Sequence, residues 1–198
     1  MKYLNISKFN TKNVKGMSKM FHDCFSLVNL NILNFETKNV LDTSEMFSGC
    51  SNLKSLDVSH LKTSKVKNMA RMFQDMPSLQ SLDVSNFDTS EVTNMNSMFQ
   101  LCDSLTKLEV KYFKTSKVRD MASLFQNCSR ITSLDVSGFD TSQVTNMAKM
   151  FAHNGRLSKL NISNFKTSKV TDMSYMFYYC KSLSSLDVSK FETGLVVI

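Results

Sequence analysis

The chain has 198 residues, of which 42% are hydrophobic, and its formal net charge is +7. The length suits one domain, and the single proline and five glycines exclude collagen-like and low-complexity linker sequences. No apolar run reaches the roughly 18 residues that a membrane-spanning helix needs. The basic start, Met1-Lys2-Tyr3, precedes no apolar segment, so we expect no secretory signal peptide.

A 26-residue repeat runs along the chain without insertion or deletion. Leucine marks its first position, and the repeats start at residues 4, 30, 56, 82, 108, 134 and 160, with a partial repeat from 186. Threonine occupies position 8 and valine position 11 in all eight copies. One unit cannot bury its own apolar side, whereas stacked copies bury a continuous core. The repeat therefore predicts a single repeat domain over residues 1–198.

Two elements are predicted in each repeat. The first is a short strand such as residues 27–32, where Leu30 and Ile32 alternate toward one inward face. The second is a short helix such as residues 40–50, because its apolar side chains form one stripe and a threonine precedes it as an N-cap. The predicted fold is α/β, a leucine-rich-repeat-like solenoid with a parallel sheet on one face and short helices on the other.

Two segments, residues 98–105 and 82–95, carry the most specific motif. They read Met-Phe-x-x-Cys-x-Ser-Leu and Leu-Asp-Val-Ser-x-Phe-x-Thr-Ser-x-Val-x-Asn-Met. This pattern resembles the bacterial surface protein 26-residue repeat, which is related to BspA-type leucine-rich repeats. The resemblance implies a parallel-stranded solenoid and a cell-surface or secreted adhesion protein, and it implies no catalytic motif. Without a signal peptide in this chain, a cytoplasmic location stays open.

Cysteine, methionine and histidine offer no catalytic or metal-binding arrangement. All five cysteines occupy position 21, so they are either buried packing residues or, in neighbouring repeats, pairs within disulfide range. Twelve of the 14 methionines sit at positions 14 and 17, which favours core filling over a soft-metal channel. The three histidines fall at three different positions and form no cluster. We expect no enzymatic activity, no cofactor and no bound metal.

An acidic stripe is predicted on the outer face of the sheet, at position 2 of the repeat. Stacked like charges repel one another, so the stripe is either relieved by nearby serine and lysine or is a binding site for a basic surface or calcium. Its candidate binding residues are Asp57, Asp83, Glu109, Asp135 and Asp187.

A tyrosine cluster breaks the repeat pattern in the last complete copy. Tyr175, Tyr178 and Tyr179 stand at predicted outward positions, where they form either an interface or a cap over the end of the core. Basic residues also gather on the predicted helix side. We expect them to be solvated rather than to bind nucleic acid, since no reading helix accompanies them. They include Lys15, Lys19, Lys67, Arg71, Arg119, Arg130, Lys149, Arg156 and Lys181.

The sequence as a whole predicts a non-enzymatic binding or adhesion module. It would recognise a protein or glycan through the exposed sheet face or its edge. The alternative is an intracellular scaffold or assembly subunit that contacts partners through the tyrosine patch and the apolar tail, residues 194–198. End-to-end self-association is a further option, because an exposed apolar tail is adhesive.

Overall fold

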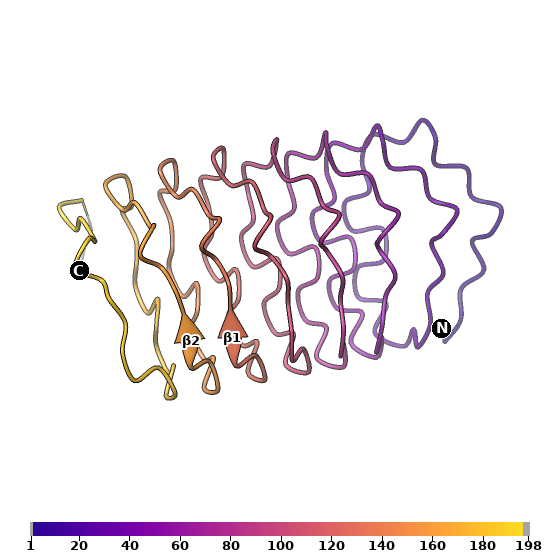
Figure 1. The fold of residues 1–198 in the computed structure, drawn as a ribbon. Helices are drawn as coiled ribbons and strands as arrows, with labels where there is room; N and C mark the ends of the chain where they lie inside the picture. The colour runs from indigo at the N-terminus through magenta and orange to yellow at the C-terminus, as the bar shows by residue number, and fades with distance from the viewer. Residues whose placement is uncertain (1, 196–198) are drawn as a thin grey trace.

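The computed structural model describes residues 2–195 as a solenoid of stacked 26-residue coils (Figure 1). Neighbouring coils make parallel contacts at position 13, from the bridge between Gly16 and Asp42 through to the bridge between Asn146 and Asp172. Two strands are present in the described residues, β1 (Ser133–Leu134) and β2 (Lys159–Leu160), and they pair in parallel. No helix long and apolar enough to cross a membrane occurs between residues 2 and 195.

The predicted helices are wrong, and so is the α/β class, because the described part of the chain contains no helix. Positions 14–21 form a series of tight turns instead. Two residues of each coil have positive φ, at positions 16 and 20; in the fourth coil these are Ser97 (φ 55°) and Leu101 (φ 62°). Residues other than glycine and asparagine rarely adopt this left-handed conformation, and it cannot occur inside an α-helix. The apolar side chains predicted to form one stripe do point to one side, but they are carried by successive turns rather than by a helix.

Hydrogen bonds between coils replace the bonds that a helix would make within itself. Within a coil, the Met98 N–H donates to the Met95 carbonyl three residues back. The next N–H along, that of Phe99, donates to the Leu124 carbonyl of the following coil at 3.1 Å. Backbone donors at positions 14, 16, 18 and 20 repeat this pattern from the first coil to the sixth. Each coil therefore needs its neighbour to satisfy its backbone.

The predicted parallel sheet is reduced to short contacts. Outside β1 and β2, the strand side contributes the bridge between Ser55 and Ser81, together with isolated backbone bonds such as Gln80 N–H to the Lys54 carbonyl at 3.0 Å. The inward side chains predicted there are nevertheless buried, as Leu82 and Val84 show.

A column of stacked phenylalanine rings at position 18 runs through the core. Neighbouring ring centroids along this column lie 5.7–5.9 Å apart. The predicted stacking of equivalent residues is confirmed for this column. Its members are Phe21, Phe47, Phe73, Phe99, Phe125, Phe151 and Phe177.

The threonines at position 8 join coils and are not helix N-caps as predicted. The Thr89 hydroxyl donates to the Lys114 carbonyl at 3.0 Å and accepts the Lys114 N–H at 2.7 Å. All seven threonines from Thr11 to Thr167 donate to the following coil in this way. Because Thr89 is fully buried, its hydroxyl has no access to water and finds its hydrogen-bond partners in the backbone of the next coil.

The cysteines are all free thiols, in agreement with the packing interpretation. They also have a polar role that the sequence did not indicate. The Cys102 thiol donates to the Phe73 carbonyl of the preceding coil at 3.1 Å, and Asn154 donates from its amide to the equivalent carbonyl of Phe125 at 2.8 Å. Cysteine and asparagine thus make the same hydrogen bond at position 21, whereas Met76, which is buried at this position in the third coil, has no donor to offer. Burial raises the pKa of the Cys128 thiol to about 12, so this thiol stays protonated at neutral pH.

Candidate interaction surface

The predicted acidic stripe lies on the exposed strand side, where its carboxylates bond to their own backbone. Asp83 accepts the N–H of Ser85 at 2.9 Å, and Asp135 accepts that of Ser137 at 3.0 Å. The same bond occurs at Asp57 and Asp187, whereas Glu109 pairs with Lys107 at 3.1 Å. Hydrogen bonds from the side chain and backbone of Ser85 lower the pKa of Asp83, and the pKa values of Asp57, Asp135 and Asp187 fall for the same reason.

A charge is not required for this local bond. Asn31 and Asn161 occupy the same repeat position and accept the equivalent backbone N–H at 3.0 and 3.1 Å. Asparagine and aspartate share this turn-forming property. The stripe therefore has a structural explanation, and its binding role stays a prediction.

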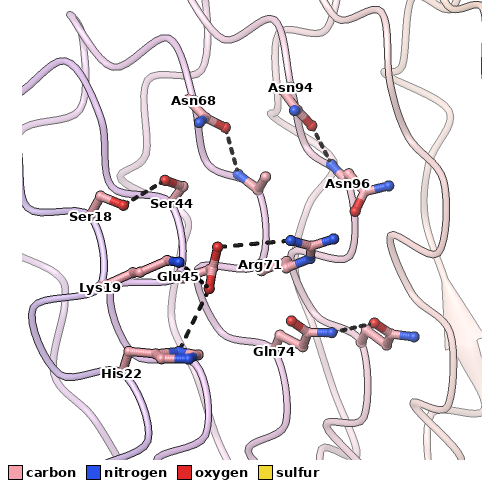
Figure 2. Close-up of polar contacts among 12 residues, drawn as sticks. Ser18, Lys19, His22, Ser44, Glu45, Asn68, Arg71, Gln74, Asn94 and Asn96 are labelled. Atoms are coloured by element: carbon pink, nitrogen blue, oxygen red, sulfur yellow. Dashed lines mark hydrogen bonds and ion pairs between the residues drawn. The ribbon is translucent and has the colours of Figure 1, made fainter.

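The opposite side of the solenoid carries the turns of positions 14–23, and we call its exposed surface the turn face. In the first coils the charges on this face pair with one another (Figure 2). Glu45 is largely buried and receives Lys19 at 3.6 Å, His22 at 3.8 Å and Arg71 at 3.8 Å. Sequence analysis did not predict this cluster, because its members stand at two different repeat positions in three coils.

Polar side chains beside this cluster also bond within the protein. Asn68 and Asn94 accept backbone N–H groups two residues ahead, as Figure 2 shows. The Gln74 amide donates to the side-chain oxygen of Gln100 at 2.6 Å, and Gln100 donates in turn to Gln126 at 2.7 Å. This part of the turn face therefore has few polar groups left over for a partner.

Charge is distributed unevenly along the turn face. Its first four segments, residues 17–26, 43–52, 69–78 and 95–104, hold two cations and four carboxylates, a net charge of −2. The last three, residues 121–130, 147–156 and 173–182, hold four cations and no carboxylate, a net charge of +4. Asp120 and Asp172 stand just before two of these segments, and each accepts a backbone N–H within its own turn.

The four cations of the last three segments are exposed and form no ion pair within residues 2–195. They are Arg130, Lys149, Arg156 and Lys181. A cation that already pairs with a carboxylate has little to offer a ligand, whereas these four are exposed and have no carboxylate partner in the described residues.

Two of these cations, Lys149 and Lys181, lie over rings of the tyrosine cluster. The exposed fractions of Tyr175, Tyr178 and Tyr179 are 62%, 51% and 53%. The Tyr178 ring packs edge-on against two other rings. Its centroid lies 5.6 Å from that of Tyr175 and 5.2 Å from that of the His153 imidazole. The ammonium of Lys181 lies 4.1 Å from the ring centroid of Tyr179. We call Arg130, Lys149, His153, Arg156, Tyr175, Tyr178, Tyr179 and Lys181 the Tyr–Arg surface.

The structure thus brings the three predicted tyrosines together with cations that were expected only to be solvated. The predicted apolar tail is described only for Gly194 and Leu195, and residues 196–198 lie outside the described part of the chain. Within residues 2–195, no group of three or more histidine, cysteine, aspartate or glutamate side chains is placed to hold a metal ion.

Comparison with known proteins gives one family. Residues 1–109, 52–132 and 102–197 match the family described as "Mycoplasma protein of unknown function, DUF285". The chain belongs to this family. The three overlapping matches agree with a repeat that runs along the whole chain. No curated protein and no solved structure matches the chain.

Proposed function

We propose that this DUF285 chain is a non-enzymatic binding module that contacts its partner through the Tyr–Arg surface. The observation that carries the proposal is the exposure of three tyrosines, with Tyr178 in contact with the other two, on the part of the turn face that carries four cations without an ion pair in the described residues. Tyrosine and arginine are enriched at binding hot spots, because each provides a large contact area together with hydrogen bonds. The regular core supports a binding role rather than catalysis, since it is filled by columns such as the stacked phenylalanines.

The resemblance to BspA-type repeats favours adhesion at a cell surface as the setting. The acidic stripe is a weaker candidate for the contact surface, because its carboxylates are exposed but bonded to adjacent serines. The scaffold alternative uses the same tyrosines, so one experiment on the Tyr–Arg surface tests both settings of the binding function.

Screening the intact chain and a tyrosine variant on arrays of purified proteins and glycans would test this function. The Tyr175→Ser/Tyr178→Ser/Tyr179→Ser variant should lose the ligands of the unsubstituted chain. The matched control is Tyr3→Ser/Tyr112→Ser, which removes tyrosines that are 72% and 70% exposed elsewhere on the molecule. Thermal unfolding would establish that both variants fold. Ligands that bind both variants equally well would contradict the proposal.

A further inference from the structure

Three cations of the Tyr–Arg surface form a row along the stack. Arg130 and Arg156 share repeat position 23 in neighbouring coils, and Lys181 stands at position 22 of the next. The coils are in direct contact here, since the Asn127 N–H donates to the Ala152 carbonyl at 3.0 Å and the His153 N–H to the Tyr178 carbonyl at 2.7 Å. Coils joined in this way place equivalent residues about 5 Å apart. The row therefore offers a cation at each step to an extended ligand.

The uneven charge along the turn face determines where an extended anionic ligand would bind. The first four segments carry a net charge of −2 and would repel an anion, whereas the last three carry +4 and attract it. The cationic part of the face is thus confined to three coils. A polymer with regularly spaced negative charges fits this part better than a single small anion does, because the cations are spread over separate coils.

The tyrosines distinguish between classes of polyanion. Single-stranded nucleic acid binds by stacking its bases on free aromatic ring faces. Here Lys181 lies 4.1 Å above the ring of Tyr179, and Lys149 lies 5.9 Å from that of Tyr175. Tyr178 also packs edge-on against Tyr175 and at a tilt against Tyr179, so neighbouring rings occupy part of the aromatic surface. Phenol hydroxyls both donate and accept hydrogen bonds, as the hydroxyls of a sugar do.

We propose that the Tyr–Arg surface binds an extended acidic polysaccharide whose chain runs along the solenoid axis. Its carboxylate or sulfate groups pair with Arg130, Arg156 and Lys181, and its sugar hydroxyls bond to the tyrosines. This inference rests on the proposed binding function and adds the chemical class of the partner. Arginine suits this role because its planar guanidinium donates two hydrogen bonds to one carboxylate or sulfate group.

The test measures the anisotropy of a fluorescent heparin octasaccharide titrated with the intact chain. Comparison ligands are an uncharged dextran oligosaccharide, an oligothymidylate and polyglutamate. The Arg130→Gln/Arg156→Gln/Lys181→Gln variant should bind heparin at least about tenfold more weakly at low salt, because it lacks three ion pairs. The control Lys54→Gln/Lys107→Gln/Lys159→Gln removes the same charge from exposed positions on the strand side and should bind as the unsubstituted chain does.

Selective heparin binding, weakened by the first variant and kept by the control, supports the inference. If the control substitutions weaken heparin binding as much, net charge alone explains the effect and the inference is overturned. Tighter binding of oligothymidylate or polyglutamate, equal binding of dextran, or no heparin binding at all would also overturn it. The chain could fail to bind heparin while the array experiment finds another ligand whose binding requires the tyrosines. In that case the proposed binding function stands and only the acidic polysaccharide is rejected as its partner.

Discussion

Single side chains in this protein complete backbone hydrogen bonds in a neighbouring coil. The threonine of position 8 bonds to both the N–H and the carbonyl of one residue, as Thr89 does with Lys114. The thiol or amide of position 21 bonds to a carbonyl of the preceding coil, as Cys102 does with Phe73. Because Thr89 and Cys102 are fully buried, losing either polar side chain leaves its backbone partner facing the packed interior without that hydrogen bond.

The hydroxyl of Thr89 is expected to matter more than its methyl group. Thr89→Val keeps the shape and removes both bonds to Lys114, so the free energy of unfolding should fall by about 2 kcal/mol. Thr89→Ser keeps the hydroxyl and should cost about 1 kcal/mol, the value of a buried methyl group. Urea unfolding of both variants measures the difference. A serine variant as unstable as the valine variant would rule out the hydroxyl as the cause.

The aspartates of the strand side predict a dependence of stability on acid pH. The serine bonds lower the pKa of Asp83 and Asp135 in the folded protein. Their contribution is therefore present above the unfolded aspartate pKa of about 3.9 and is lost as the pH falls through the lower folded pKa. In the Asp83→Asn/Asp135→Asn variant the amide oxygens keep the bonds but do not titrate. Urea unfolding from pH 6 down to about pH 2 should give this variant a shallower loss of stability, and an unchanged slope would refute the assignment.

At the scale of the coil, turns rather than helices organise positions 14–21. The positive φ angles at positions 16 and 20 reverse the chain locally, so that alternate N–H groups point to the next coil. Most of the residues at these positions are not glycine; Ser123, for example, has a φ of 56°. The left-handed conformation costs such residues of the order of 1 kcal/mol, and the bonds between coils offset this cost.

Replacing Ser123 with glycine should relieve this backbone cost. Ser123→Gly is expected to raise the free energy of unfolding by about 0.5 kcal/mol, because the saving is partly cancelled by the greater freedom of glycine in the unfolded chain. Ala122, whose φ is not positive, provides the matched control. Ala122→Gly should lower stability by about 1 kcal/mol, because it removes a buried methyl group and adds freedom to the unfolded chain. Two variants that change stability in the same direction would contradict the role assigned to the positive φ.

At the scale of the whole molecule, each coil bonds only to the coils before and after it. Core columns and backbone bonds repeat every 26 residues, so one coil presents nearly the same surfaces as the next. The stability of such an array is approximately a sum over coils and their contacts. Surface charge does not follow this regularity, and the last three turn segments differ from the first four. The proposed binding surface is therefore confined to three coils although the fold is uniform.

Removal of one complete repeat should preserve the fold. Deleting residues 95–120 joins Asn94 to Met121 and keeps every column in register. Deleting residues 95–107 joins Asn94 to Leu108 and breaks the register. The first variant should unfold cooperatively, with a urea m-value lower by about one seventh, since that fraction of the buried surface is lost. The second should lose cooperative unfolding. Equal behaviour of the two deletions would show that register is not what holds the coils together.

The sequence by itself determined the 26-residue period of the repeat, the columns of inward side chains and the absence of insertions between repeats. A constant 26-residue spacing places Phe47, Phe73 and Phe99 at equivalent points whatever the local backbone does. It also located the three tyrosines as an exception to the pattern. A stripe spaced by threes did not distinguish a helix from successive turns, because both return a side chain to the same side after three residues.

Only the tertiary structure decided the conformation of the backbone within each coil and which charged side chains are paired. The backbone acceptors for the N–H groups of positions 14, 16, 18 and 20 lie in the next coil, so no local preference reveals them. The same holds for Glu45, whose three basic neighbours come from the coils before and after its own, and for Arg130, Arg156 and Lys181, which find no carboxylate in the described residues. Whether a charge is paired depends on distances between coils, and the sequence gives only the order of residues within each.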